Sequence, residues 1–296
     1  MIQLPYIQPL FRPPSEGRSL ILQVTNGCSW NNCTFCDMYT QPQKKFRLKP
    51  QDEIERELAS VAKTAVPVRR IFLADGDAMT LSFRRLKLIM EAINKQLPNV
   101  QRVSSYCLPR NLKNKSVDEL AELNAMGLQL FYVGCESGDN LVLERVNKGE
   151  NFNSSLAALK KIKAAGARSS VMILNGMGGK RYSEQHAINS ARLMSEAQPE
   201  YLSTLVVSFP GGTERYQQGF HGEFEALDQQ GLFQEMYWLL SNLELENTIF
   251  RSDHASNYLV LKGILNRDKP RLLHTVRAAL SHPGSVSLRP ESMRGL

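Results

Sequence analysis

Short apolar runs alternate with longer segments of helical periodicity over most of the chain, and this alternation is what most constrains the fold. Six runs predict strands, and five segments between them predict helices. The expected strands are residues 20–24, 70–74, 103–107, 128–133, 168–174 and 201–208, and the expected helices are residues 51–65, 82–97, 116–127, 154–165 and 183–197. Repeated strand–helix units indicate an α/β fold with parallel strands and right-handed crossovers. Because a closed barrel of this kind has eight units, six units predict an open, partial (β/α)6 parallel barrel.

The rest of the chain is expected to surround this barrel. Four parts are expected: an N-terminal strap of residues 1–19, the barrel of residues 20–215, a helical C-terminal extension of residues 216–282 and a disordered tail of residues 283–296. Within the extension, residues 223–240 and 268–281 are expected to be helices, with a third segment around residues 252–263. No apolar stretch is long enough to cross a membrane, and the N-terminus is too polar for a signal peptide. Free cysteines without an export signal predict a reducing cytoplasm.

Three of the five cysteines follow the first expected strand with the spacing C-x4-C-x2-C: Cys28, Cys33 and Cys36. Three thiolates within nine residues predict a soft-metal site that lacks its fourth ligand. A structural zinc ion needs four protein ligands, and the remaining cysteines, Cys107 and Cys135, stand alone in the sequence. An iron–sulfur cluster is therefore favoured and zinc stays open as the alternative. The odd number of cysteines argues against a disulfide framework.

Further motifs follow the later strands. They are Asp75-Gly76-Asp77 after the second strand, Gly134-Cys135-Glu136-Ser137-Gly138 and Asn147-Lys148-Gly149 after the fourth, Met172-Ile173-Leu174-Asn175-Gly176 at the end of the fifth, and Pro210-Gly211-Gly212-Thr213 after the sixth. Loops at the carboxyl ends of parallel strands open on one face, where α/β folds place their chemistry. Small residues there permit close approach of the backbone to a ligand, and carboxylates favour an ammonium group.

The cysteine loop and these motifs, taken in order, resemble the radical S-adenosylmethionine (SAM) superfamily over about residues 18–215. The resemblance is nearest to the branch of oxygen-independent coproporphyrinogen oxidases and methylthiotransferases. The usual cysteine spacing in that superfamily is x3 then x2, so this chain has one extra loop residue. The resemblance implies a [4Fe-4S] cluster on Cys28, Cys33 and Cys36, with SAM on the open iron.

The resemblance also implies which residues contact SAM. They are Phe35, Gly76, Asp77, Glu136, Lys148 and Leu174. Phe35 and Leu174 would lie near the adenine, and the loop of Gly76 and Asp77 would bind the methionine amino group. Relatives carry Glu where Asp77 stands, so the shorter Asp77 leaves its backbone as the contact. Glu136 would bond a hydroxyl or amine of SAM, and Lys148 would pair with its carboxylate, without the bidentate fork of an arginine.

The implied chemistry is reductive cleavage of SAM to a 5′-deoxyadenosyl radical, which takes a hydrogen atom from a substrate. The cofactors supply this reaction, and the protein positions them and excludes water. The expected partners are a small-molecule substrate and a one-electron donor of the flavodoxin or ferredoxin kind, with no membrane. The net charge of +7 keeps an RNA-modifying enzyme open as a second reading, although basic helix faces explain it better. A non-catalytic zinc or iron–sulfur protein is the alternative from another class.

No residue of the barrel is singled out as a catalyst. Two weak candidates, His254 and Tyr258, lie in a polar run beyond the barrel that could line a substrate pocket. A helix N-terminus capped by Ser252 or Asp253 explains the same run slightly better. Cys107 and Cys135, near the ends of their strands, are interpreted as small buried hydrophobic residues, with a radical or thiol role as the less favoured alternative.

Overall fold

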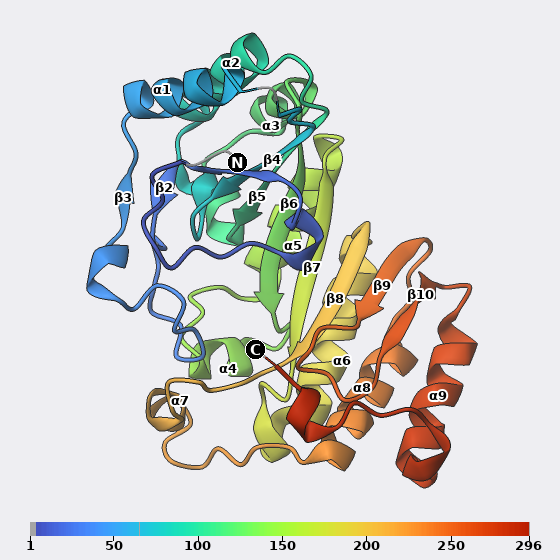
Figure 1. The fold of residues 1–296 in the computed structure, drawn as a ribbon. Helices are drawn as coiled ribbons and strands as arrows, with labels where there is room; N and C mark the ends of the chain where they lie inside the picture. Colours follow the sequence, from blue (N-terminus) through green and yellow to red (C-terminus); the bar gives the residue numbers. More distant parts are fainter. Residues whose placement is uncertain (1–3, 65, 296) are drawn as a thin grey trace. The chain divides into compact units, whose positions relative to one another are not determined.

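The chain forms two compact units in the computed structural model, which describes residues 4–64 and 66–295 (Figure 1). The first unit contains the described residues of 1–31, 38–133 and 160–169, and the second contains those of 32–37, 134–159 and 170–296. The eight longer strands are hydrogen-bonded in the order β1–β4–β5–β6–β7–β8–β9–β10, so β1 and β10 are the end strands. β6 and β7 each contribute residues to both units.

The first unit carries the beginning of the parallel sheet. Its strands are β1 (Leu20–Gln23), β4 (Arg70–Ala74), β5 (Arg102–Cys107) and most of β6 (Leu128–Glu136), and each pairs in parallel with the next. Helices α1 (Gln51–Ala62), α2 (Phe83–Gln96) and α3 (Val117–Ala125) pack against one another in that order (Figure 1). A small antiparallel sheet joins β2 (Thr25–Asn26) to β3 (Arg47–Leu48).

The expected signals explain these helices. α1 buries Ile54, Leu58 and Val61, which recur at the helical period. α3 begins after Ser116, whose hydroxyl accepts from the backbone of Glu119 while the Glu119 carboxylate accepts from the backbone of Ser116. Four short 3-10 turns complete the unit: η1 (Pro14–Glu16), η2 (Pro42–Lys44), η3 (Ala78–Thr80) and η4 (Pro109–Leu112).

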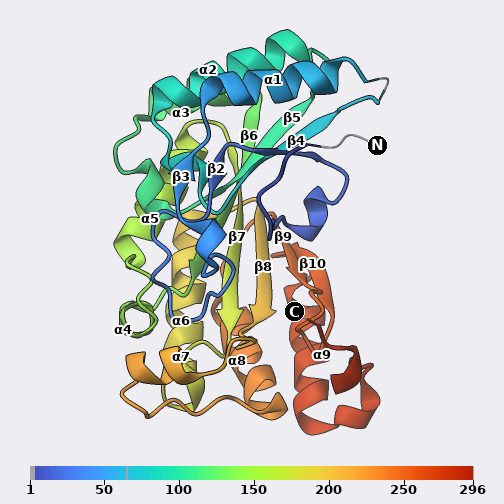
Figure 2. The ribbon, with the colours of Figure 1, turned by 60° about the vertical axis from the view of Figure 1, so that its left-hand side comes forward.

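The second unit continues the sheet with β7 (Arg168–Asn175), β8 (Tyr201–Val206), β9 (Thr248–Ser252) and β10 (Leu261–Leu265). β7, β8 and β9 are parallel, and β10 runs antiparallel to β9 (Figure 2). Its helices are α4 (Asn140–Arg145), α5 (Phe152–Ala164), α6 (Gly179–Ala197), α7 (Glu214–Gly219), α8 (Gln229–Asn242) and α9 (Lys269–Ser281). α6 packs on α8 and α8 on α9. All six expected strands and the mostly parallel α/β class are confirmed, and no described helix has the length and hydropathy needed to cross a membrane.

The C-terminal extension is not purely helical, which corrects the expectation for residues 216–282. β9 and β10 form an antiparallel pair within it, and β9 extends the parallel sheet beyond the six expected strands. The run from Thr248 to Ser252 alternates in burial as a half-exposed strand does, so its period is two rather than 3.6. The segment around residues 252–263 is a turn leading into β10, and α8 begins only after Asp228, whose side chain caps Gly231.

The tail is also not disordered over its described residues 283–295. It forms two 3-10 turns, η5 (Pro283–Ser285) and η6 (Glu291–Met293), and Leu288 bridges to Leu259. The Arg289 guanidinium donates to the carbonyl oxygens of His254 and Asn257, at 2.6 Å each. Because these bonds join the Arg289 side chain to backbone carbonyls of a turn, the hydrophobic pattern of the sequence could not predict them. Residue 296 lies outside the described residues.

The described strap residues, 4–19, are held on the first unit by polar contacts. The hydroxyl of Tyr6 donates to the carbonyl of Ile21 at 2.9 Å, and the backbone N–H of Ile7 donates to the side chain of Gln23 at 3.0 Å. Lys44 donates to the carbonyl of Ile7 at 3.0 Å and forms an ion pair with Asp75. Both side chains of that ion pair are fully buried.

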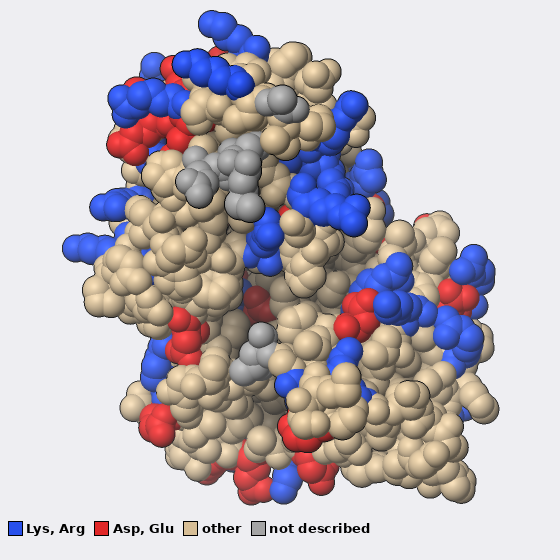
Figure 3. All heavy atoms as spheres, viewed as in Figure 1, with Lys and Arg blue, Asp and Glu red and all other residues tan. Residues whose placement is uncertain are grey.

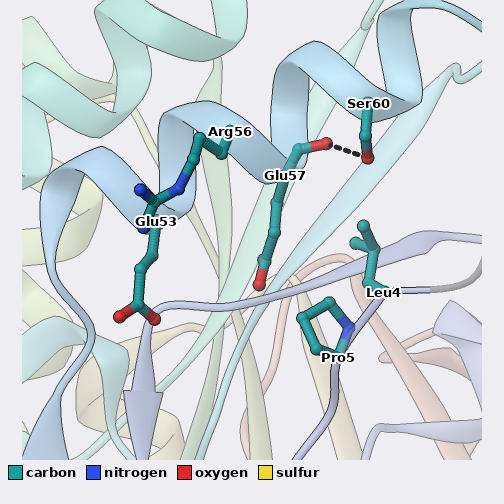
Figure 4. A pocket seen from close by; sticks show the side chains of 6 residues that line it. All are labelled: Leu4, Pro5, Glu53, Arg56, Glu57 and Ser60. Carbon is teal, nitrogen blue, oxygen red and sulfur yellow. Dashed lines mark hydrogen bonds between the residues drawn. The ribbon is translucent and has the colours of Figure 1, made fainter.

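A cavity of about 320 Å³ lies between the strap and α1 (Figure 4). Its lining residues are Leu4, Pro5, Glu53, Arg56, Glu57 and Ser60. None of the residues that the sequence marks as site residues lines it. Oε1 of the Glu57 carboxylate forms an ion pair with Lys49, whereas its buried Oε2 has no hydrogen-bond partner.

The buried Lys44–Asp75 pair should contribute strongly to stability, because removing one partner leaves the other charge in a dry interior. We expect Lys44→Met to lower the free energy of unfolding by about 3–5 kcal/mol, as measured by urea denaturation. Lys180→Met is the matched control. Lys180 pairs with Glu225 on the exposed surface, so its loss should cost less than about 1 kcal/mol. Equal losses in the two variants would contradict a structural role for the buried pair.

Candidate functional site

The cysteine loop leaves the first unit after Asn31 and returns to it at Met38. Cys28 lies in the first unit, Cys33 and Cys36 lie in the second, and all three are partly exposed. Gly27 has a φ of +71°, and a Cβ there would stand 1.9 Å from the carbonyl oxygen of Lys44. The residue before Cys28 must therefore be glycine, both for its backbone conformation and for lack of space.

The motif after β4 packs directly on the loop around Cys28. A Cβ at Gly76 would lie 2.8 Å from a ring carbon of Tyr39 and 3.0 Å from the Cβ of Cys28, so any other residue would collide with the loop. The Asp77 carboxylate accepts from the backbone N–H of Ser29 at 3.0 Å and from its hydroxyl, and Asn111 donates to it at 3.4 Å. Burial raises the pKa of Asp77, and the bonds from Ser29 oppose that rise. The carboxylate thus holds the residue after Cys28.

In the second unit, the loop around Cys33 and Cys36 is tied to the end of α4. The backbone N–H of Thr34 donates to the carbonyl of Val146 at 3.0 Å, and the Asn147 side chain donates to the carbonyl of Asn32 at 3.2 Å. The loop is thereby fixed to the two residues that precede Lys148. Neither α4 nor this attachment was expected from the sequence.

Glu136, the last residue of β6, pairs with Lys148 at 3.0 Å, and both side chains are buried. Glu136 has a φ of +64°, which a non-glycine residue adopts only at a cost. Gly134 makes room for its carboxylate, since a Cβ there would lie 2.1 Å from Oε1. Burial alone would lower the pKa of Lys148, but the charges of Glu136 and Cys33 outweigh it, so the pKa is raised and the lysine stays charged.

Phe35 and Leu174 share one apolar cluster in the second unit. The buried members of the cluster are Val142, Val146, Leu174, Met177, Tyr216, Phe220 and Phe224, and Phe35 packs against them. The Lys148 ammonium lies 5.7 Å from the centre of the Phe35 ring. Four of the six expected SAM contacts, Phe35, Glu136, Lys148 and Leu174, are therefore joined through direct contacts or one shared cluster. Gly76 and Asp77 lie together in the first unit.

A buried polar network that the sequence reading missed lies behind the loops after β6 and β7. The ring of His186 is 2.7 Å from the hydroxyl of Ser137 and 3.1 Å from the carbonyl oxygen of Leu174. The Glu235 carboxylate accepts from the backbone N–H of Gly176 at 2.6 Å and from the hydroxyl of Ser183 at 2.5 Å. Burial raises the pKa of Glu235, and the nearby His186 opposes that rise. A lone histidine within a helix gave no signal of this arrangement.

The weak catalytic candidates have local partners. The Nδ1 atom of His254 accepts from the backbone N–H of Ser256 at 3.1 Å, and burial and Arg289 lower the pKa of His254, so its ring is neutral. The hydroxyl of Tyr258 donates to Glu291 at 2.5 Å, and Arg294 stacks on the ring. Both residues therefore hold the turn after β9 to the tail, and a catalytic role for them stays a prediction.

The two other cysteines are buried, as expected. Burial raises the pKa of the Cys135 thiol to about 12, so this group is not a thiolate near neutral pH. Cys107 is 2% exposed and its thiol faces the carbonyl of Leu108 at 3.4 Å. Neither cysteine has the character of a ready metal ligand.

The donor set fits a cluster and a charged amino-acid ligand. Three partly exposed cysteines supply soft donors, and each ligand of a cubane binds its own iron, so the sulfurs need not converge on one point. No three His, Cys, Asp or Glu side chains among residues 4–64 and 66–295 converge as ligands of a single metal ion. Within the same residues, Oε2 of Glu136, Oδ1 of Asp75 and Oε2 of Glu57, which lines the cavity beside α1, are buried carboxylate oxygens without a hydrogen-bond partner. Such oxygens suit an ammonium or hydroxyl group of a ligand.

A model of the radical SAM superfamily matches residues 22–213. The chain belongs to the radical SAM superfamily. Enzymes of this superfamily bind a [4Fe-4S] cluster and SAM, which agrees with the cofactors inferred from the cysteine loop. The match begins within β1 and ends just before α7, so it covers the end of the first expected strand and all of the other five, and it leaves β9, β10 and helices α7, α8 and α9 outside.

The similarity to individual relatives is more distant. The heme chaperone HemW of Bacillus subtilis (strain 168) is 25% identical over 184 residues, which are 59% of this chain and 47% of that protein. Coproporphyrinogen III oxidase (HemN) of Escherichia coli has a similar structure, with a TM-score of 0.59 and 18% identity over 75% of this chain and 52% of that one. The cobalamin-dependent SAM radical enzyme OxsB, with aqua-cobalamin and SAM bound, matches with a TM-score of 0.51 and 16% identity over 69% of this chain and 30% of that one. The chain spans about half the length or less of the curated relatives it matches.

The raised pKa of Glu235 gives a pH-dependent expectation. Its folded-state pKa exceeds the unfolded value, so the folded state binds more protons between about pH 4.3 and the raised pKa. The stabilising contribution of protonated Glu235 is complete below that window and is lost as the pH rises through it. Glu235→Gln removes this loss, so the melting temperature of the variant minus that of the wild type should increase from about pH 5 to about pH 7.5.

Thermal melts of Glu184→Gln provide the control, because Glu184 is exposed on α6. Its difference from the wild type should stay flat over the same range. A flat difference for Glu235→Gln as well would show that the buried carboxylate does not titrate as the structure requires.

Proposed function

We propose that the chain is a radical SAM enzyme that binds a [4Fe-4S] cluster through Cys28, Cys33 and Cys36 and cleaves SAM reductively. The observation that carries this proposal is the buried Glu136–Lys148 pair. Oε2 of Glu136 has no hydrogen-bond partner, the Glu136 backbone is left-handed, and the Lys148 ammonium lies 5.7 Å from the centre of the Phe35 ring. A buried charged pair with an unsatisfied oxygen lowers the stability of the fold, and a ligand that bonds this oxygen would offset the loss. Its charges match the amino and carboxylate groups of an amino-acid moiety.

Each residue has a distinct role in this proposal. The bound cluster and SAM would supply one-electron cleavage to a 5′-deoxyadenosyl radical that takes hydrogen from the substrate. Glu136 accepts hydrogen bonds from the ligand through Oε2, and Lys148 pairs with a ligand carboxylate while it neutralises Glu136. Phe35 and Leu174 present apolar surface to the adenine and exclude water from it. Gly76 lets the backbone approach the ligand closely, and Asp77 keeps the cysteine loop in place.

A small-molecule substrate is favoured over RNA. On the face that Figure 3 shows, Lys and Arg side chains form several separate groups, with Asp and Glu among them, rather than one basic track. RNA binding draws its affinity from many phosphate contacts and falls steeply with salt. An electron donor of the flavodoxin or ferredoxin kind and a reducing compartment belong to the same proposal, because a reduced cluster requires both.

The alternative function is binding of a ligand without catalysis, because the relative HemW is named as a heme chaperone.

Formation of 5′-deoxyadenosine distinguishes an enzyme from a protein that only binds its ligand. We expect anaerobically reconstituted protein to produce it from SAM and dithionite, and Cys28→Ala, Cys33→Ala and Cys36→Ala each to abolish the product. Cys107→Ala is the matched control, because Cys107 is a buried thiol in β5 rather than a loop ligand. Product that persists in the triple alanine variant would refute the proposal.

The SAM contact of Glu136 is tested by binding alone. We expect Glu136→Gln to weaken the affinity of the reconstituted protein for SAM by about ten-fold, because a charge-assisted hydrogen bond is replaced by a neutral one. Equilibrium dialysis with labelled SAM measures this. Glu144→Gln, an exposed change on α4, should leave the affinity within about two-fold of the wild type. An unchanged affinity in Glu136→Gln would remove Glu136 from the site.

A further inference from the structure

Arg215 in α7 bonds the backbone of the cysteine loop at several points. One guanidinium nitrogen, Nη2, donates to the carbonyl oxygen of Cys33 at 3.0 Å. The other, Nη1, lies 3.5 Å from the carbonyl oxygen of Cys36 and donates to the Asp37 carboxylate at 3.0 Å. The planar fork of an arginine can serve several acceptors at once, which a lysine ammonium on its flexible stem does less well.

The surroundings of Arg215 hold it in this position. The loop before α7 packs directly on Asp37, since a Cβ at Gly211 would stand 2.5 Å from a carboxylate oxygen of that residue. The next residue, Tyr216, is fully buried, and its hydroxyl donates to the carbonyl of Met177 at 2.5 Å. Tyr216 also stacks on Phe220, with ring centres 5.0 Å apart. A short helix anchored by a buried tyrosine therefore presents the guanidinium to the loop.

We infer that Arg215 is a positioning residue for the second and third cluster cysteines and that its charge tunes the cluster. Its bonds span Cys33 to Asp37, the segment that also carries Phe35. One positive charge beside two thiolate ligands favours the reduced cluster, which carries one more negative charge than the oxidised one. The negative charge of Asp37 and the 43% exposure of the Arg215 side chain both weaken this effect. The inference rests on the proposed function.

Two substitutions separate the two roles. Arg215→Lys keeps the charge and loses the fork, whereas Arg215→Gln loses both. Arg181→Gln is the control, because Arg181 forms an exposed ion pair with Glu223 elsewhere in the same unit. Hydrogen exchange of residues 33–37 is measured in the full chain without the cluster, and chelator-driven cluster loss and the midpoint potential are measured after reconstitution.

In the cluster-free chain, the amides of Thr34 and Cys36 report on the loop, since both donate to backbone carbonyls. We expect them to exchange about five-fold faster in Arg215→Gln and in Arg215→Lys than in the wild type. After reconstitution, both variants should lose the cluster to a chelator about ten-fold faster. Only Arg215→Gln should shift the midpoint potential to a more negative value, and Arg181→Gln should match the wild type in every measurement.

Wild-type exchange and cluster-loss rates in both Arg215 variants would overturn the positioning role, and an unchanged potential in Arg215→Gln would overturn the role of the charge. Should Arg215→Gln fail to fold, the comparison of Arg215→Lys with the wild type still decides the positioning role, and a potential shifted in Arg215→Lys would contradict the charge role. A wild-type chain that takes up no cluster would refute the proposed function, whereas the exchange measurement on Arg215 would keep its meaning.

Discussion

The ion pair between Lys44 and Asp75 is the interaction on which the first unit depends. Both side chains are removed from water, and around them gather the strap, through the carbonyl of Ile7, and the cysteine loop, through the backbone N–H of Gly27. A buried charge tolerates few arrangements, because each loss of a partner leaves it unsatisfied in a medium of low dielectric constant. The position of Gly27, the residue before Cys28, is therefore set by contacts within the chain and does not need a bound metal.

The second unit uses a different means for the other two cysteines. There the loop is held by backbone bonds to the end of α4 and by Arg215, and the charged pair of Glu136 and Lys148 adjoins the ring of Phe35. The three cysteines of the proposed cluster are thus divided between the two units, with Cys28 in the first and Cys33 and Cys36 in the second.

The hydrophobic periodicity, together with the capping and turn residues, was enough to predict the six parallel strands and most of the helices between them. β4 and β7 each contain an uninterrupted apolar run, residues 71–74 and 171–174, and caps such as Ser116 mark where helices begin, so local chemistry decides these elements. β9 and the tail were not predicted, because β9 is held by pairing with β8 and the tail is held by bonds from Arg289 to the turn after β9, and these contacts join segments far apart in the sequence. The candidate site was likewise predicted only in part. Cys28 and Glu136 belong to motifs that the sequence shows, whereas Glu235 and Arg215 bond backbone groups, and no pattern of side chains reveals such bonds.

The left-handed backbone of Glu136 has a consequence for attempts to stabilise the protein. Glycine would adopt that conformation freely, but it would also leave the buried Lys148 ammonium without its partner. A left-handed residue costs about 1–3 kcal/mol, whereas an unpaired buried charge costs about 3–5 kcal/mol. A screen for heat resistance that samples one substitution at a time therefore gains nothing from glycine at position 136, and only a joint change of Glu136 and Lys148 could relieve the strain.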